Sequence, residues 1–327
     1  MNKRAAIGVD IGGTSTKLGL VDPQGRVLFR DSFLTHNAHG KKKLLDMILK
    51  HVHDLMRTAE DRRLKVAGVG VGAPGPIDVR RGWVYFFPNI PGWKDTPFKK
   101  LLERRLGIPT IVDNDANAMA YGEFCFGAGR GSKNMLAMTL GTGIGGGLVI
   151  DGKLFHGPAF SAAEVGHMVL NENGPLCACG NHGCIETYVG NGYFIREVRR
   201  RLKAGQKSLL TQELRKGKDL TPLAVAQAAR RGDALSKLMW QETGEHLGNA
   251  LVGLTNLLNP EKIILGGGIA QNGDLLFKPV VQTLAKKAFP IAAASVKVVP
   301  AELGVDAGLI GAAALALFGT DPPPKAR

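Results

Sequence analysis

Aromatic residues are scarce in this chain, because Phe, Trp and Tyr together make up 6% of its 327 residues. Surfaces that bind single-stranded nucleic acid stack bases on aromatic side chains among basic ones, so no nucleic-acid partner is expected. Long apolar runs are also missing, since none reaches the roughly 20 residues of a membrane-spanning helix. The first residues, MNKRAAIGVD, lack the apolar core of a secretory signal. We therefore expect a cytoplasmic protein without a membrane partner.

Acidic residues are outnumbered, with 28 Asp and Glu against 42 Lys and Arg, which gives a formal net charge of +14. Such an excess is typical of proteins with an anionic partner, such as a nucleotide or polyphosphate. The basic residues are scattered, however, and the clusters that begin at Lys41, Arg62 and Arg196 fall in expected helices. Solvated helix faces therefore explain most of the charge.

Cysteine is also rare, but three of the four cysteines stand in the eight residues CACGNHGC, from Cys177 to Cys184. A disulfide is improbable in the cytoplasm. The spacing instead fits a tetrahedral zinc site that lacks one ligand, and the residues alone leave His167 and His182 as candidates. With four protein ligands no position stays open for substrate, so the metal would be structural. Cys125 stands alone in an apolar segment and is expected in the core.

The chain contains two similar units about 130 residues apart. Residues 4–29 and 134–155 both read as three strands in which the first turn is made of glycines. Between them we expect a helix over 41–63, a buried strand from 65 running into a Gly-Pro loop, and a strand from 109 that breaks into a helix at Asn114 or Asp115.

The second half predicts further helices and strands. Helices are expected near 187–203, 221–231 and 234–258, strands over 262–270 and 294–299 with a helix between them, and a closing helix over 307–318 that packs back on the first lobe. The alternation of strands and helices indicates an α/β architecture.

Three glycine runs could approach a nucleotide closely. DIGGTSTK, residues 10–17, forms a turn whose backbone amides can point at a phosphate, and Asp10 at the strand end could hold a magnesium ion. LGTGIGGG, residues 140–147, stands at the matching place in the second unit. LGGGI, residues 265–269, is either a simple strand-to-helix turn or a contact for the adenosine part.

Asn114 and Asp115 lie at the end of a predicted strand, where open α/β sheets gather their ligands. Asp115 could simply cap the following helix. It could also accept the proton of an attacking hydroxyl group.

Eight motifs together resemble the ROK family of sugar kinases, within the actin-like ATPase superfamily, and its bacterial glucokinases in particular. They are DIGGTSTK, GAPGPID, PNIPGW, DNDANA, LGTGIGGG, EVGH, CACGNHGCIE and LGGGI, in the family's order and across nearly the whole chain. One position departs from the pattern, since Ala163 precedes EVGH where the family usually has glycine. That substitution puts the shape of the adjoining loop in question.

The resemblance implies a two-lobed α/β fold of the actin-like ATPase (ribonuclease H-like) type with an inserted structural zinc loop over 167–184. The smaller lobe would comprise 1–113 and about 310–327, and the larger lobe 114–309. A homodimer or homotetramer is also implied.

The resemblance further implies ATP-dependent phosphorylation of glucose at the 6-hydroxyl, with Asp115 as the base. The other sugar contacts would be Gly75, Asn114, Glu164, His167 and Glu186. ATP and Mg²⁺ would be held by Asp10, Gly12, Gly13, Thr14, Lys17, Thr142, Gly143, Gly266, Gly267 and Gly268. The Zn²⁺ ligands would be His167, Cys177, Cys179 and Cys184, with His182 as the alternative to His167. Because the zinc would anchor the segments of Glu164 and Glu186, its loss is expected to impair sugar binding more than nucleotide binding.

Other functions share these motifs. A ROK kinase for mannose, fructose or N-acetylglucosamine would share nearly all of them, and a polyphosphate-using glucokinase would suit the positive charge, although LGGGI favours ATP. A sugar-responsive ROK repressor requires an added helix-turn-helix domain, for which the nine residues before Asp10 leave no room.

Overall fold

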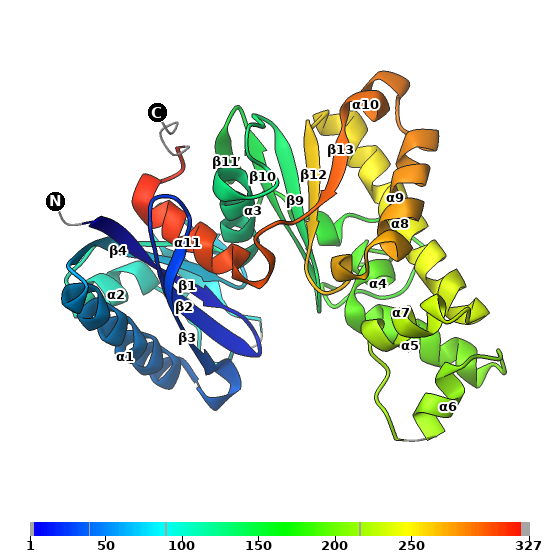
Figure 1. Cartoon of the computed structure of the whole chain (residues 1–327), viewed down its shortest axis with the longest axis horizontal. Coiled ribbons are helices and arrows are strands. Elements are labelled where there is room, and N and C mark those ends of the chain that lie inside the picture. Colours follow the sequence, from blue (N-terminus) through cyan, green and yellow to red (C-terminus); the bar gives the residue numbers. More distant parts are fainter. Residues whose placement is uncertain (1–2, 39, 89, 216, 322–327) are drawn as a thin grey trace. The chain divides into compact units, whose positions relative to one another are not determined.

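The computed structural model describes residues 3–321 except 39, 89 and 216 (Figure 1). Asn89 of the PNIPGW motif thus lies outside the described residues. The chain divides into two compact units. The first comprises residues 1–137, 147–163 and 301–327, and the second comprises 138–146 and 164–300. The predicted lobe boundary at 113/114 stays a prediction, because compactness does not tell which segments move together.

The first unit is built on a five-stranded sheet with the order β3-β2-β1-β4-β8. As predicted, β1 (Lys3–Ile11), β2 (Ser15–Val21) and β3 (Val27–Leu34) form an antiparallel meander. β4 (Leu64–Ala73) runs parallel to β1, and β8 (Thr110–Asn114) runs parallel to β4. The carboxyl ends of β1, β4 and β8 therefore meet at one edge of the sheet.

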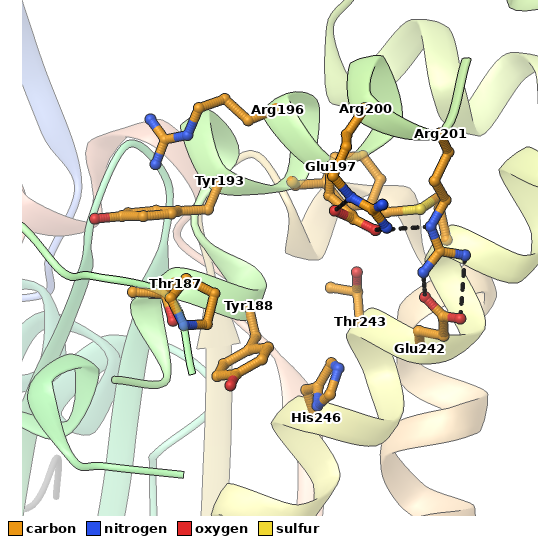
Figure 2. A pocket seen from close by; sticks show the side chains of 13 residues that line it. Thr187, Tyr188, Tyr193, Arg196, Glu197, Arg200, Arg201, Glu242, Thr243 and His246 are labelled. Atoms are coloured by element: carbon orange, nitrogen blue, oxygen red, sulfur yellow. Dashed lines mark hydrogen bonds and ion pairs between the residues drawn. The ribbon is translucent and has the colours of Figure 1, made fainter. Parts of the chain in front are cut away.

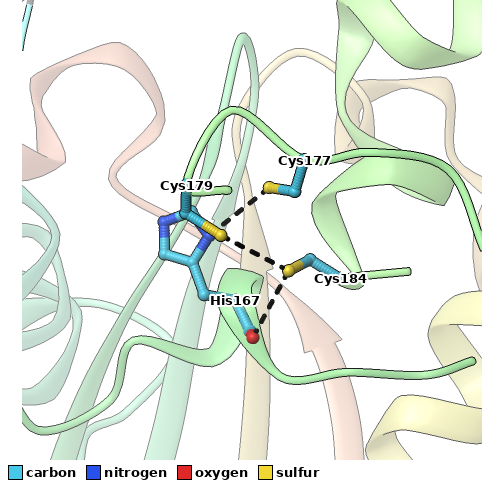
Figure 3. Close-up of side chains that lie close together, drawn as sticks. All are labelled: His167, Cys177, Cys179 and Cys184. Atoms are coloured by element: carbon cyan, nitrogen blue, oxygen red, sulfur yellow. Dashed lines mark hydrogen bonds between the residues drawn. The ribbon is translucent and has the colours of Figure 1, made fainter. Parts of the chain in front are cut away.

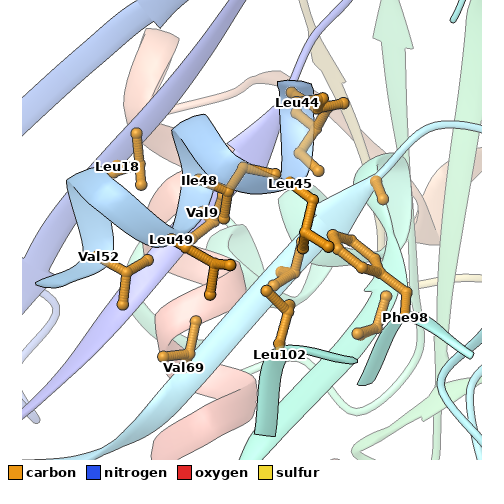
Figure 4. Packing of buried hydrophobic residues seen from close by; sticks show 14 of the residues in the cluster. Val9, Leu18, Leu44, Leu45, Ile48, Leu49, Val52, Val69, Phe98 and Leu102 are labelled. Atoms are coloured by element: carbon orange, nitrogen blue, oxygen red, sulfur yellow. The ribbon is translucent and has the colours of Figure 1, made fainter. Parts of the chain in front are cut away.

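Two helices cover opposite faces of this sheet because side chains alternate along each strand. Val9 belongs to the cluster that buries the apolar stripe of α1 (Gly40–Asp61), including Leu44 and Ile48 (Figure 4). On the other face, a Cβ at Gly8 would lie 2.1 Å from the Leu309 carbonyl oxygen of α11 (Ala307–Phe318). The closing helix thus packs directly on the first sheet, as the sequence indicated.

The second five-stranded sheet has the order β11-β10-β9-β12-β13. Its strands are β9 (Met135–Leu140), β10 (Ile144–Ile150), β11 (Lys153–Phe155), β12 (Lys262–Gly266) and β13 (Lys297–Pro300). The second predicted meander is confirmed. The predicted strand over 294–299 began too early, because α10 (Pro290–Ser295) extends to Ser295. The sequence did not predict a third sheet of three short strands, β5 (Ile77–Asp78), β6 (Trp83–Phe86) and β7 (Lys94–Thr96).

The remaining helices follow the predicted order with three differences. They are α2 (Phe98–Leu106), α3 (Asp115–Phe126), α4 (Glu186–Val189), α5 (Asn191–Lys203), α6 (Leu210–Arg215), α7 (Pro222–Arg230), α8 (Ala234–Leu258) and α9 (Asp274–Lys287). The helix predicted near 187–203 is broken into α4 and α5, because Gly190 adopts an extended conformation. Neither α2 nor the short α6 was predicted. Within the described ranges, no helix combines the length and apolar character needed to cross a membrane.

Candidate functional site

The first glycine turn connects β1 to β2 and presents backbone to solvent. The Gly12 N–H donates to the Ser15 carbonyl at 3.1 Å, and a Cβ at Gly12 would lie 2.8 Å from that same oxygen. Gly13 and Thr14, at the tip of the turn, are exposed. The turn is therefore narrow, and its tip is accessible to a phosphate group.

Asp10 and Lys17 are directly opposite each other on β1 and β2. The Lys17 ammonium donates to the Val305 carbonyl at 2.7 Å, so it also ties β2 to the segment before α11. Burial raises the pKa of Asp10 to about 6, an effect that Lys17 opposes and Asp306 reinforces. A Cβ at Gly308 would lie 2.8 Å from the Asp10 carboxylate, so glycine at 308 keeps that space free.

Asp10→Asn is expected to stabilise the ligand-free protein at neutral pH. The pKa of Asp10 is about 6 in the folded state against 3.8 ordinarily. The stability that this group contributes is therefore full below pH 3.8 and is lost as the pH rises through about 6. The loss is on the order of 3 kcal/mol.

Denaturant unfolding at pH 4.5 and 7.5, without Mg²⁺ or nucleotide, measures this effect. The Asn variant should exceed the parent slightly at pH 4.5, where part of the loss has already occurred, and by much more at pH 7.5. Asp46→Asn, on the exposed face of α1, is the control. Equal stability of Asp10→Asn and the parent at both pH values contradicts the expectation.

The junction of β8 and α3 carries the predicted sugar-binding pair. The Asn114 side chain caps α3 by accepting from the N–H groups of Ala116 at 2.9 Å and Asn117 at 3.3 Å. Its amide nitrogen donates to the Gly75 carbonyl at 3.3 Å. The helix cap is thus Asn114 rather than Asp115, which occupies the first helical position. Asn114, Asp115 and Gly75 come together at the carboxyl edge of the first sheet.

In the second unit, the predicted zinc ligands converge (Figure 3). One ligand atom from each of His167, Cys177, Cys179 and Cys184 lies within 4.8 Å of all the others. The Cys179 and Cys184 sulfurs are 3.6 Å apart, and the Cys177 sulfur is 3.7 Å from His167 Nδ1. A tetrahedron with Zn–S bonds of about 2.3 Å has edges of about 3.8 Å, so the cluster fits zinc.

His182, the alternative ligand, faces another group. Its Nδ1 lies 3.1 Å from the Gly174 carbonyl oxygen. The structure therefore places His167, and not His182, among the thiols.

Glu186 lies at the start of α4 and contacts the second glycine turn. Its Oε2 accepts from the Ile144 N–H at 2.8 Å, and a Cβ at Gly143 would lie 2.8 Å from the same oxygen. The turn of Glu164 to His167 also packs here, since a Cβ at Gly166 would lie 2.2 Å from the Ile144 carbonyl. In this unit, the segments predicted to bind the sugar, around Glu164 to His167 and at Glu186, therefore both contact the glycine turn predicted to bind phosphate.

The third glycine run lies beside the same turn. The Ile269 N–H donates to the Leu140 carbonyl at 3.1 Å, and a Cβ at Gly267 would lie 2.5 Å from that oxygen. Gly267 also has a φ of 86°, which favours glycine. The third glycine run therefore contacts Leu140, the last residue of β9, which directly precedes the second glycine turn.

Ala163, the departure from the family pattern, has a left-handed φ of 64°. For a residue with a Cβ this conformation costs about 1–2 kcal/mol. The loop before Glu164 therefore keeps the left-handed conformation that glycine adopts easily, and the alanine at 163 is strained in it.

Sequence reasoning missed three buried charged or titratable residues of the first unit. Glu123 is fully buried and accepts from the N–H groups of Ala128, Glu302 and Leu303. It fastens α3 to the segment before α11. Asp113 and His156 form a second buried contact. The signal for Asp113 was an acidic residue inside an otherwise apolar strand.

A cavity of about 360 Å³ lies between α4, α5 and α8 (Figure 2). Glu197 binds Arg200 and Arg201, and Glu242 binds Arg201. Burial lowers the pKa of His246, which also lines the cavity. None of the predicted site residues lines it.

The chain is similar to known proteins over nearly its whole length. The model of the ROK family matches residues 6–318. The chain is 38% identical to a glucokinase of Halalkalibacterium halodurans over 312 residues, which cover 95% of this chain and 94% of that protein. It is 36% identical to a glucokinase of Thermotoga maritima over 315 residues, which cover 96% and 98%. A crystal structure of a ROK family glucokinase from Streptomyces griseus in complex with glucose and AMPPNP is similar with a TM-score of 0.81 and 36% identity, covering 96% of this chain and 100% of that one.

Proposed function

The chain belongs to the ROK family, and we propose that it is a glucose kinase, which transfers the γ-phosphoryl group of ATP to the 6-hydroxyl of glucose. The observation that carries the proposal is the similarity over nearly the full length to the Streptomyces griseus glucokinase that binds glucose and AMPPNP. The convergence of the predicted residues within each unit supports it.

Asp115 accepts the proton of the attacking 6-hydroxyl. Its place at the carboxyl end of β8, next to the capping Asn114, supports this role. A positioned base of this kind typically contributes 10²–10⁴-fold to the rate. Asn114 and the Gly75 backbone bind other hydroxyls of the sugar.

Glu164, His167 and Glu186 provide the remaining sugar contacts. His167 can serve both the metal and the sugar, because its Nδ1 faces Cys177 and leaves Nε2 for a hydroxyl. One oxygen of Glu186 already accepts from the Ile144 N–H, which fixes the direction of the other. Zinc would be held by His167, Cys177, Cys179 and Cys184, and it would supply structural support only.

The phosphates of ATP lie against the two glycine turns. Gly12, Gly13 and Thr14 present one turn, Thr142 and Gly143 the other, and Gly266 to Gly268 adjoin the adenosine. Lys17 stands beside Asp10 and adds positive charge. Mg²⁺, when bound with ATP, neutralises phosphate charge. The Asp10 carboxylate is a hard oxygen ligand of the kind that Mg²⁺ prefers. Burial raises the free energy of the Asp10 charge when no cation compensates it, which favours a bound cation here.

We also infer a homodimer or homotetramer and a cytoplasmic location, as the sequence led us to expect.

Initial rates with a panel of sugars and donors test the proposal. With ATP, kcat/KM should be higher for glucose than for mannose, fructose or N-acetylglucosamine, because a pocket matched to hydroxyl groups rejects analogues that leave its polar groups unpaired. With glucose, ATP should exceed polyphosphate. A preference for another sugar contradicts the substrate, and a preference for polyphosphate contradicts the donor.

A further inference from the structure

A buried polar pair lies directly behind the β8–α3 junction. The Nε2 of His156 is 2.7 Å from Oδ2 of Asp113, and the two side chains are 11% and 2% exposed. A carboxylate removed from water requires hydrogen-bond partners, because desolvation of an unpaired charge is costly. His156 is the partner of this oxygen.

The second oxygen of Asp113 holds the junction itself. Its Oδ1 accepts from the Asn114 N–H at 2.7 Å and from the Asn117 amide at 3.0 Å. Asn114 in turn caps α3 and donates to Gly75. One carboxylate therefore fixes the residue before Asp115 and the residue two positions after it.

His156 is the first residue of the loop that follows β11. Its carbonyl accepts from the Ala162 N–H at 3.1 Å, which closes the loop on itself. Phe160 and Ala163 have left-handed φ values of 58° and 64°. The His156 side chain contacts Asp113 of β8, and the Arg80 guanidinium lies 5.3 Å from the centroid of the Phe160 ring.

From this geometry we infer that His156 is a positioning residue for phosphoryl transfer, which acts through Asp113 to hold Asn114 and Asp115 in the reactive arrangement. The inference rests on the proposed function, since it assigns Asp115 the proton. Without the His156 donor, Oδ2 of Asp113 is left unpaired, and the carboxylate must turn toward water. That rotation releases the Asn114 N–H and the Asn117 amide together.

The consequence for catalysis follows from the required precision. A misplacement of about 1 Å at a reacting group costs up to about 100-fold in rate. The glycine turns belong to other segments, so binding of ATP should change little.

The test compares His156→Gln with His156→Asn, a pair that differs by one methylene. The Gln amide reaches the position of Nε2 and can still donate to Asp113, whereas the shorter Asn amide cannot. We expect His156→Asn to lower kcat/KM for glucose about 10–100-fold with KM for ATP within about twofold. His156→Gln should recover most of the loss.

His156→Phe keeps the ring without the donor and should resemble His156→Asn. His53→Asn, at an exposed histidine of α1, is the control and should match the parent. Rates are normalised to the folded fraction from thermal unfolding. If His156→Asn and His156→Phe keep the kcat/KM of the parent, or if Gln and Asn lose equally, the inference is wrong.

Amide hydrogen exchange separates this inference from the proposed function. In His156→Asn, but not in His156→Gln, exchange should accelerate in the absence of any substrate at the backbone N–H of Asn114, which donates to Asp113, and at the backbone N–H of Asn117, which donates to the Asn114 side chain. A parent that phosphorylates no sugar refutes the function, while this exchange result still decides whether His156 holds the junction. Unchanged exchange in His156→Asn refutes the positioning role whatever the activity.

Discussion

Replacing Asp115 by Asn is expected to lower kcat roughly 10²–10⁴-fold while glucose still binds. The substitution removes the proton acceptor but keeps an oxygen that can accept from the Ala116 N–H, as Asp115 does at 2.8 Å. The start of α3 should therefore keep its structure. Steady-state kinetics together with calorimetric titration of glucose separate the loss of turnover from binding.

Asp61→Asn, at an exposed position near the end of α1, is the matched control. It changes the same charge without touching the β8–α3 junction and should leave kcat unaltered. If Asp115→Asn turns over at a rate near that of the parent, Asp115 is not the base.

Loss of the zinc cluster is the second large effect expected. Cys179→Ser should lower the zinc content, lower the melting temperature and raise the Kd for glucose, because the ligands connect the segment of Glu164 to the segment of Glu186. The affinity for ATP should fall less. It should nevertheless change, since Glu186 also bonds the Ile144 N–H of the second glycine turn.

Metal analysis and calorimetric titration of both ligands measure this effect, with Cys125→Ser as the control for loss of a buried thiol outside the cluster. Backbone hydrogen bonds from Ile185 to Met168 and from Leu170 to Gly183 also join the two segments. If these bonds alone hold the two segments in place, a folded, zinc-free Cys179→Ser variant binds glucose like the parent. The cluster then stabilises only its own loop and has no effect on the sugar site. A parent without one zinc per chain contradicts the site itself.

Elements with strong local patterns could be predicted from the sequence. The meanders were recognisable because apolar runs alternate with glycine turns, and α1 because its apolar residues recur at helical spacing. The three short strands β5 to β7 were missed, because two to four residues are too few to show a period. The break at Gly190 was also missed. A Cβ at Gly190 would lie 2.8 Å from the Glu186 carbonyl oxygen, and this close contact within the fold is not visible in the sequence.

Site residues could be predicted from the sequence where residues of suitable chemistry stand close together in one motif. The zinc ligands are an example. The spacing of the cysteines identified the three thiols, whereas the choice of His167 over His182 depended on family resemblance. Contacts between distant segments left no local signal. Lys17 donates to a carbonyl 288 residues away, and His156 pairs with a carboxylate 43 residues away. Neither partner could be inferred from residue type alone.

The identity of the product tests the proposed function most directly. The purified chain, incubated with ATP, Mg²⁺ and glucose, should form ADP and a sugar phosphate in equal amounts. The phosphorus resonance of that sugar phosphate should couple to the two protons on C6, because the phosphoryl group moves to the 6-hydroxyl. ADP without a sugar phosphate, or phosphate on any other hydroxyl, contradicts the proposal.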